Sequence, residues 1–353
     1  MKLKRKSKME SINKLWKICS LMVILFYAVN NSQAQNKIIK TGKQMRDTNG
    51  NLINAHGGGI LFYKGIYYWY GEIKKGKTSR VANTDWEDFR VNAGGISCYS
   101  SSDLKNWRYE GVALAPDMID SLNDLHFTKV IERPKVIYNS KTNQFVMWMH
   151  IDNQMYSAAR SGVATSNSPI GPFHYINSER PNNNMARDMT LFQDEDGRAF
   201  YFFSSEDNAT MHICLLTDDY LKCTQYEQRI MINQKREAPA VFKYNKKYYL
   251  ISSGCTGWIP NAAAYAVADS IMGEWKYLDN PCTGANSANT YHSQSTYVLK
   301  LPGANNQYLF MADRWNKNNL EKSTYLWLPM IMNSEGEPKI LYKKKWNLAN
   351  IKP

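Results

Sequence analysis

The stretch Glu237–Gly254, EAPAVFKYNKKYYLISSG, holds two runs of apolar and aromatic residues that flank a polar turn. Short runs of this composition on either side of an Asn- or Gly-containing turn are typical of a β-hairpin. A carboxylate, Glu237, stands directly ahead of the first run. The stretch therefore predicts a hairpin whose first strand starts at an acidic side chain.

The same pattern occurs five times along the chain. The leading residues of the other four copies are Gly57, Glu132, Asp188 and Gln294, so that successive copies start 75, 56, 49 and 57 residues apart. Repeats of short strands at such a period are typical of propeller blades or of a β-solenoid. In repeats arranged around an axis, equivalent positions converge on that axis. The pattern therefore predicts an all-β fold and, in a propeller, a central cluster of polar leading residues.

The first 34 residues have the pattern of a secretory signal peptide. Basic residues precede an apolar segment, Ile18–Val29, which is shorter than the roughly 20 residues that span a membrane, and Ser32–Ala34 offers a small-residue cleavage site. We expect residues 1–34 to be removed and residues 35–353 to form one secreted or periplasmic domain; an uncleaved anchor is the alternative. Removal would take away seven of the 44 basic and one of the 31 acidic residues, which lowers the net charge from +13 to +7.

The remaining composition excludes several classes of function. The basic excess is scattered, without runs of Lys and Arg among aromatic residues, which argues against nucleic-acid binding. No glycine-rich phosphate-binding motif occurs. We expect a monomer with no cofactor, no nucleic-acid partner and, after cleavage of the signal peptide, no contact with a membrane.

The cysteines indicate no metal site. Five of the six remain after residue 34, and their spacing matches no zinc pattern. We expect small, buried apolar residues at these positions, with a disulfide between Cys214 and Cys223 across a hairpin as the alternative. Asp194–Gly197, DEDG, resembles a fragment of a calcium loop but lacks the Glu that would complete it, so we interpret it as a hairpin turn.

Several of these stretches resemble glycoside hydrolase family 43, a family of five-bladed β-propellers. Asp188–Phe192 and Glu237–Ala240 are similar to the third- and fourth-blade segments of the family. Four further strings, in order along the chain, resemble the branch that holds the exo-β-1,3-galactanases: Asn54–Gly59, Trp69–Glu72, Glu132–Lys135 and Ser293–Thr296. The resemblance covers essentially all of the chain after residue 34. It implies a five-bladed β-propeller that inverts configuration and releases galactose from β-1,3-galactan, a plant-type polysaccharide.

The resemblance also assigns catalytic roles. A glycosidase needs a general acid at the leaving oxygen, and an inverting one also needs a base that activates water, with about 6.5–9.5 Å between the two groups. The resemblance makes Glu237 the acid, and gives Asp188 the role of positioning the substrate and raising the pKa of the acid. Most members of the family carry a catalytic Asp at the leading position of the first blade, where this chain has Gly57.

Two residues remain as candidates for the base. In the galactanase branch a glutamine, here Gln294, holds the attacking water, although an amide is a poor base unless it reacts as its imidic-acid tautomer. Glu132 is chemically the better base, but the matching residue of the branch mainly binds and orients the sugar. The sequence leaves both assignments open.

Sugar binding needs flat apolar faces and planar hydrogen-bonding groups. Trp258, just beyond the second strand of the Glu237 hairpin, is the first candidate for stacking on a sugar, and Trp315 and Tyr156 follow. Glu72 resembles a carboxylate of the branch that binds sugar hydroxyls. His56 either donates to a sugar or braces the glycines that follow it.

Alternatives to this function remain. The commoner activities of the wider family are those of an α-L-arabinofuranosidase or a β-xylosidase. A catalytically inactive carbohydrate-binding propeller would explain the missing Asp, but Glu237 lies in an intact Arg-Glu-Ala-Pro string, which argues for an enzyme. Some relatives hold a calcium ion in the central channel, and the sequence does not decide whether this chain does.

Overall fold

The computed structural model describes residues 38–82, 87–301 and 307–348. The expected signal peptide, residues 1–34, lies outside the described residues. Within these ranges there are 25 β-strands and three short 3₁₀ helices, and no helix is long and apolar enough to cross a membrane. The 3₁₀ helices are η1 (Pro181–Asn183), η2 (Ser287–Asn289) and η3 (Leu320–Lys322).

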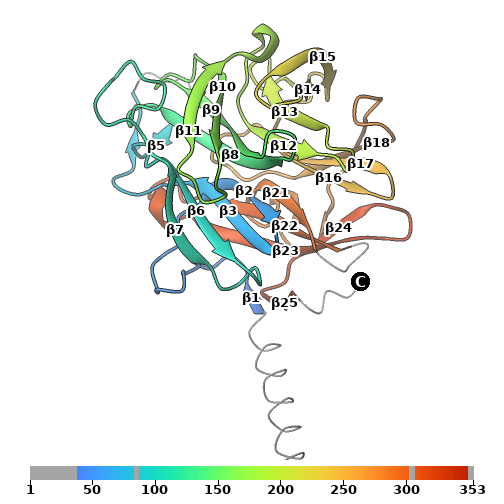
Figure 1. The fold of residues 1–353 in the computed structure, drawn as a ribbon. Helices are drawn as coiled ribbons and strands as arrows, with labels where there is room; N and C mark the ends of the chain where they lie inside the picture. The colour runs from blue at the N-terminus through green and yellow to red at the C-terminus, as the bar shows by residue number, and fades with distance from the viewer. Residues whose placement is uncertain (1–37, 83–86, 302–306, 349–353) are drawn as a thin grey trace, which may run out of the picture.

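Five sheets form the blades of a five-bladed β-propeller, which confirms the expected fold (Figure 1). The strands of blade 1 are β2 (His56–Tyr63), β3 (Ile66–Glu72), β6 (Ile96–Ser101) and β7 (Arg108–Leu114). Those of blade 2 are β8 (Val130–Asn139), β9 (Gln144–Asp152), β10 (Arg160–Ser166) and β11 (His174–Glu179). Those of blade 3 are β12 (Met189–Gln193), β13 (Ala199–Ser205), β14 (Thr210–Leu216) and β15 (Cys223–Ile230).

Blades 4 and 5 complete the ring. The strands of blade 4 are β16 (Arg236–Tyr244), β17 (Lys247–Gly254), β18 (Ala264–Ala268) and β19 (Lys276–Leu278). Those of blade 5 are β21 (Gln294–Lys300), β22 (Gln307–Arg314), β23 (Thr324–Met332) and β24 (Pro338–Leu341), to which β20 (Cys282–Thr283) adds in parallel. Two small pairs lie outside the blades: β4 (Ser79–Arg80) with β5 (Phe89–Arg90), and β1 (Ile38–Lys40) with β25 (Lys345–Asn347).

The junction between blades 5 and 1 closes the ring. The hydroxyl of Tyr325, in β23, accepts the Ala55 N–H at 2.8 Å and donates to the carbonyl of Ile53 at 3.1 Å, just ahead of β2. Trp69, Trp107 and Trp327 are at most 1% exposed and pack between these two blades with ring centroids 4.8–6.0 Å apart. Because buried aromatic rings contribute large apolar areas, this cluster stabilises the closure.

The first strand of every blade lies innermost. In Figure 1 these strands surround the centre of the molecule, and each one contacts the first strand of the next blade: β2, β8, β12, β16 and β21. Four of them carry a one-residue β-bulge near the start, where the register with the second strand shifts after His56, Glu132, Glu237 and Ser295. Bulges re-aim side chains, and here they lie at the polar starts of the strands.

The bulges correct one detail of the sequence-based alignment. The register shifts place His56, and not Gly57, at the position in blade 1 that Glu132 and Glu237 hold in blades 2 and 4. Gly57 instead matches the residues that follow the two glutamates, and all three have a left-handed backbone, with φ of 61°, 56° and 54°. The extra residue of a bulge is not visible in the spacing of the repeats.

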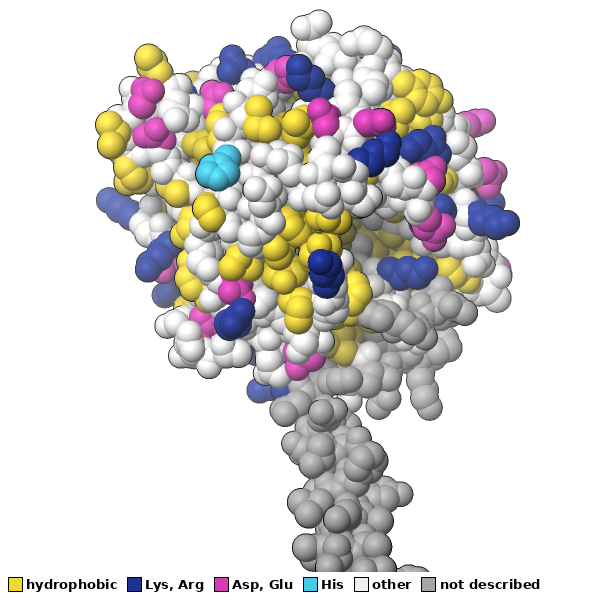
Figure 2. Space-filling model, viewed as in Figure 1, with side chains coloured by type: hydrophobic (Ala, Val, Ile, Leu, Met, Phe, Trp, Pro, Cys, Tyr) yellow, Lys and Arg dark blue, Asp and Glu magenta, His cyan; other side chains and the backbone are white. Residues whose placement is uncertain are grey.

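Two sequence-based expectations about turns and cysteines have different outcomes. Asp194–Gly197 forms the turn between β12 and β13 as expected, and the Gly197 N–H donates to the Asp194 carbonyl at 3.0 Å. Cys214 and Cys223 form a disulfide between β14 and β15, with Cα atoms 5.7 Å apart, so the expectation that they are simply buried apolar residues is wrong. On the face shown in Figure 2, basic and acidic side chains are interspersed, in line with the scattered charge of the sequence.

Candidate active site

The polar leading residues of blades 2 to 5 come together at the centre of the propeller. Arg133, the residue after Glu132, joins three blades. Its Nε lies 2.9 Å from Oδ1 of Asp188, and its Nη2 lies 2.6 Å from Oε1 of Gln294. Nε2 of Gln294 in turn donates to Oε1 of Glu237 at 2.8 Å. The convergence that the repeats predicted is therefore confirmed.

Carboxylates from neighbouring blades hold the left-handed bulges in place. Each bulge directs a backbone N–H at one carboxylate: Gly57 at Oδ2 of Asp313 (2.6 Å), Arg133 at Oε1 of Glu72 (3.0 Å) and Ala238 at Oδ2 of Asp188 (3.0 Å). A Cβ at Gly57 would lie 2.1 Å from Oε1 of Glu72, so only glycine fits beside this carboxylate. The backbone thus fixes three carboxylates around the axis.

Glu237 is arranged as a proton donor. Burial, followed by the negative charge of Asp188, raises the pKa of Glu237 to about 8, and the guanidinium of Arg133 offsets only part of this rise. The carboxyl group is therefore mostly protonated at neutral pH, as a general acid requires. This environment suits the roles that the resemblance gives to Glu237 and Asp188.

Glu132 lies among cationic and hydroxyl groups. The hydroxyl of Tyr156 donates to both carboxylate oxygens at 3.0 Å. Nζ of Lys74 lies 3.2 Å from Oε1, and Nδ1 of His150 lies 3.5 Å from Oε2. Burial raises the pKa of Glu132, but Lys74 and His150 outweigh burial and hold it well below the usual range. Such a carboxylate is a weak base and a constant hydrogen-bond acceptor, which suits the binding of sugar hydroxyls.

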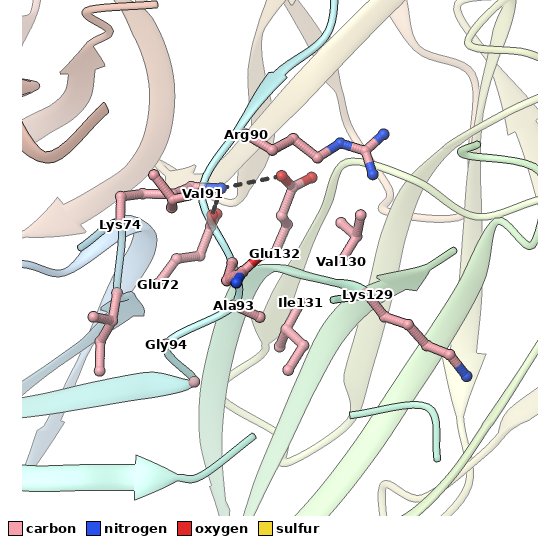
Figure 3. A pocket seen from close by; sticks show the side chains of 13 residues that line it. Glu72, Lys74, Arg90, Val91, Ala93, Gly94, Lys129, Val130, Ile131 and Glu132 are labelled. Atoms are coloured by element: carbon pink, nitrogen blue, oxygen red, sulfur yellow. Dashed lines mark hydrogen bonds and ion pairs between the residues drawn. The ribbon is translucent and has the colours of Figure 1, made fainter. Parts of the chain in front are cut away.

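Lys74 links Glu132 to the second carboxylate of this group, Glu72 (Figure 3). Its Nζ lies 2.7 Å from Oε2 of Glu72. Burial raises the pKa of Glu72, and the ammonium group of Lys74 offsets only part of the rise. The guanidinium of Arg90 lies 4.2 Å from the ring centre of Tyr156 and covers that ring. Glu72, Lys74, Arg90 and Glu132 line a polar hollow on this side of the centre.

Every hydrogen-bonding position of the Gln294 amide is occupied. Oε1 accepts from Nη2 of Arg133 at 2.6 Å and from Nε1 of Trp315 at 3.0 Å. Nε2 donates to Glu237 at 2.8 Å and to Oγ of Ser253 at 3.2 Å. Arg and Trp side chains only donate, so they determine which end of the amide is the oxygen. The orientation of Gln294 is therefore set by its neighbours.

A second hollow opens beside Gln294. Trp258 and Trp315 line it, and their rings meet edge to face, with centroids 6.1 Å apart and an angle of 84°. The indole N–H of Trp315 is engaged by Gln294, and the ring of Tyr156 is covered by Arg90. Trp258 is partly exposed at this hollow and stays a prediction as a surface for stacking on a sugar.

His56 is directed into the protein. It is 1% exposed, its Nδ1 lies 3.2 Å from Oδ1 of Asp313, and its ring stacks on that of Tyr325 at a centroid distance of 4.8 Å. Of the two roles that the sequence left open for His56, this placement suits the bracing of the glycines.

Lys135 occupies the axis of the propeller beside these groups. Its Nζ lies 2.8 Å from the carbonyl oxygen of Gly57 in blade 1. A Cβ on Gly59 would lie 2.8 Å from Cδ of Lys135 and 3.0 Å from Cδ2 of Tyr297 in blade 5, so the missing side chain of Gly59 leaves room for both residues. Burial and the positive charge of Arg133 lower the pKa of Lys135 to about 7.

The groups on the axis do not fit a calcium ion. Calcium takes about six to eight oxygen ligands, whereas this channel holds the ammonium group of Lys135 with the guanidinium of Arg133 beside it. In the part of the chain that the structure describes, no group of three or more His, Cys, Asp or Glu side chains could hold a metal ion.

Several residues of the site were missed at the level of sequence. Each of them contacts a residue on another blade or on the paired strand. They are Lys74, Arg133, His150, Ser253 and Asp313. Arg133 belongs to the Glu132–Lys135 string, so the sequence analysis could have included it among the candidate site residues. His150 and Asp313 are the cross-strand partners of Glu132 and Gln294, which becomes visible only when the register is known.

A glycosidase uses a pair of carboxyl groups beside the scissile bond, one of them an acid with a raised pKa. Residues 71–336 match the family model described as glycosyl hydrolases family 43, and the chain belongs to this family. It is thus an enzyme that hydrolyses glycosidic bonds. A comparison with curated protein sequences gives no significant match.

Several solved structures are similar to this chain. A family 43 β-1,3-galactosidase in a structure with galactodeoxynojirimycin is 42% identical, with a TM-score of 0.82 over 88% of this chain and 100% of that one. An exo-β-1,3-galactanase from Phanerochaete chrysosporium, in a structure with β-1,3-galactotriose, is 34% identical, with a TM-score of 0.78 over 88% of this chain and 68% of that one. An exo-β-1,3-galactanase from Clostridium thermocellum is 37% identical, with a TM-score of 0.77 over 88% of this chain and 66% of that one.

Proposed function

We propose that the enzyme is an inverting, exo-acting glycosidase that removes terminal galactose from β-1,3-galactan. The similarity to one β-1,3-galactosidase and two exo-β-1,3-galactanases, at 34–42% identity, supports this substrate. The observation that carries the proposal is the state of Glu237, a partly buried carboxyl whose pKa of about 8 keeps a transferable proton in the site, 2.8 Å from Nε2 of Gln294.

Hydrolysis begins with proton transfer from Glu237 to the glycosidic oxygen while the bond to the anomeric carbon breaks. The glycosidic oxygen takes the place that Nε2 of Gln294 holds at Glu237 in the absence of substrate. This exchange frees one N–H of the amide, which then donates to the attacking water and orients it. Attack from the opposite face gives α-galactose as the first product.

The two hollows bind the two sugars on either side of the scissile bond. The charged group of Glu72, Lys74 and Glu132, with the hydroxyl of Tyr156, suits the hydroxyl-rich terminal sugar. The hollow beside Trp258 offers an aromatic surface for the sugar that leaves. A charged hollow for the terminal sugar and an aromatic wall for the sugar that leaves fit removal of one residue at a time from a chain end.

We also propose that the enzyme is exported and acts without a metal ion. The signal-peptide pattern of residues 1–34 and the disulfide between Cys214 and Cys223 support export, because disulfides persist in oxidising compartments. The ammonium group of Lys135 on the axis supports independence from calcium.

Digestion of β-1,3-galactan, arabinan and xylan, with chromatography of the products, tests the substrate. We expect galactose from β-1,3-galactan alone, and NMR at early times should show α-galactose as the first anomer. Release of arabinose or xylose without galactose would assign the enzyme to the other activities of the family. β-Galactose as the first anomer would exclude inversion, and no release from any substrate would point to a sugar-binding propeller.

A further inference from the structure

His150 lies buried between two carboxylates of blade 2. It is the cross-strand partner of Glu132 in the pair of β8 and β9, and Asp152 follows two residues later, so the three side chains share one face of the sheet. Nε2 of His150 lies 3.0 Å from Oδ2 of Asp152, and Nδ1 lies 3.5 Å from Oε2 of Glu132. Burial lowers the pKa of His150, but the two carboxylates outweigh burial and raise it to about 9. At neutral pH the ring therefore carries a proton on each nitrogen, and each nitrogen faces one carboxylate.

The second oxygen of Asp152 holds the loop that carries Tyr156. This loop connects β9 to β10, and Oδ1 of Asp152 accepts the N–H of Asn153 at 2.9 Å and that of Ala158 at 2.8 Å, which ties the start of the loop to its end. Between them Tyr156 has a left-handed backbone, with φ of 52°, a conformation that a bulky residue adopts only where its surroundings hold it. From this position its hydroxyl donates to both oxygens of Glu132 at 3.0 Å.

Asp152 itself is too deeply buried to touch a sugar. Asp152 and His150 are each 1% exposed, and neither lines the polar hollow beside Glu132. The side chain of Glu132, in contrast, is 19% exposed and lines that hollow. The two oxygens of Asp152 thus lead to the same carboxylate by two routes, through the ring of His150 and through the loop that carries Tyr156.

We propose that Asp152 is a positioning residue for the terminal sugar and that it acts by holding Glu132 in one orientation. This inference rests on the proposed function, in which Glu132 binds a hydroxyl of that sugar. The ring of His150 brings a positive charge to one oxygen of Glu132, and the loop brings the hydroxyl of Tyr156 to both. A carboxylate held from several sides presents its remaining acceptor positions in a fixed direction, which a sugar hydroxyl has to match.

Asp152→Asn separates positioning from folding. The amide oxygen can still accept the two N–H groups of the loop, whereas the NH2 group that replaces Oδ2 faces Nε2 of His150 and cannot accept its hydrogen. On an aryl β-galactoside we expect KM to rise by about threefold or more and kcat to change by less than about twofold, because Glu237 and Gln294 keep their contacts. Asp218→Asn makes the same substitution at an exposed carboxylate and should leave both constants unchanged.

A double-mutant cycle shows whether Asp152 acts through Glu132. In the Glu132→Gln background, Asp152→Asn should change KM by less than about twofold, because the charged group on which Asp152 acts is gone. An equal rise of KM in both backgrounds would overturn the inference. A wild-type KM in Asp152→Asn would also overturn it.

The protonation of His150 tests the network without any substrate. Nitrogen-15 NMR of the histidine side chains at about pH 8, below the pKa of about 9, should show an imidazolium in the wild type that is absent in His150→Gln. In Asp152→Asn the signal of a neutral ring should replace it. A neutral His150 in the wild type would overturn the inference. A wild-type enzyme that releases no galactose would instead contradict the proposed function, and the spectra would still decide whether the network exists.

Discussion

Nε2 of Gln294 lies 2.8 Å from Oε1 of Glu237, so the amide and the general acid touch at the centre of the propeller. In an inverting glycosidase the sugar carbon lies between the general acid and the attacking water, which Gln294 is proposed to orient. The contact therefore belongs to the enzyme without substrate. Binding of the sugar has to open it, and this releases both groups for the reaction.

Glu237→Gln keeps the shape of the side chain and its contact with Gln294 but removes the transferable proton. General acid catalysis contributes about 100- to 10,000-fold, and we expect a loss of kcat in this range on β-1,3-galactan. Aryl galactosides with good leaving groups need little protonation, so their hydrolysis should be affected much less. Steady-state kinetics on both substrates provide the measurement, and equal losses on the two would contradict the role of Glu237.

The pH dependence of kcat/KM should report the proton of Glu237. Because the acid must be protonated, activity should fall as pH rises through about 8, the pKa to which burial and Asp188 raise this group. The charged or titratable groups that face it are Asp188, Arg133, Arg236 and the thiol of Cys255. Asp188→Asn removes a negative charge and should move the alkaline limb to lower pH.

The shift should be partial, since burial is the larger cause of the raised pKa and remains in the variant. Asp218→Asn is a matched control, because its side chain is 92% exposed and pairs with Lys141 in the turn between β8 and β9. Full pH–rate profiles of the three proteins provide the comparison. An alkaline limb that does not move in Asp188→Asn would show that another group titrates.

Gln294→Ala and Glu132→Ala should affect different kinetic constants. Without the amide, water is no longer oriented, so kcat should fall on galactan and on aryl galactosides while galactose still binds. Loss of Glu132 removes hydrogen bonds to a charged group, which contribute about 1.5–3 kcal/mol each, so KM should rise by at least tenfold. Kinetics together with calorimetric titration of galactose separate the two. A Gln294→Ala enzyme with normal kcat would remove this residue from the mechanism.

Lys135→Met tests the buried ammonium group through stability. Lysine in an unfolded chain titrates near about 10.4, whereas burial and Arg133 lower the pKa of folded Lys135 to about 7. Between these values the unfolded chain binds the additional proton, so this group makes stability rise with pH. The free energy of unfolding of the wild type minus that of Lys135→Met should therefore increase from about pH 7 to about pH 10 and stay constant below that range.

Denaturant unfolding at several pH values measures this difference, and a flat profile would contradict a lowered pKa for Lys135. In the same experiment, addition of calcium or of a chelator should leave the Tm of the wild type unchanged. A chelator-dependent loss of stability would show that a metal ion shares the axis with Lys135.

The sequence predicted the parts of the molecule that recur. The five-fold pattern of polar leading residue, strand, turn and strand located β8, β12, β16 and β21 and the side chains that meet at their starts. It placed the leading position of blade 1 at Gly57, one residue beyond His56, because each bulge adds a residue that the spacing does not show. The periodicity of the sequence therefore predicted the propeller fold but not the register between the first and second strands of blade 1.

The rest of the site depends on contacts between blades. Asp313 reaches Gly57 across 256 positions of the chain, and Arg133 reaches Gln294 across 161. No local pattern encodes these pairs, since they follow from ring closure and strand register. The disulfide between Cys214 and Cys223 was predicted only as an alternative, because two cysteines nine residues apart can face each other across a hairpin. Composition alone favoured two buried thiols.

The three carboxylates that accept bulge N–H groups, Glu72, Asp188 and Asp313, have a consequence for how this enzyme can be remodelled. Each one accepts a backbone N–H from the neighbouring blade beside the candidate active site, so removal of the carboxylate group affects the junction of two blades as well as the site. Trp258, on the wall of the outer hollow, takes no part in such a junction. Substitutions intended to change the sugar chain that the enzyme accepts are therefore better placed at Trp258 than at the three carboxylates.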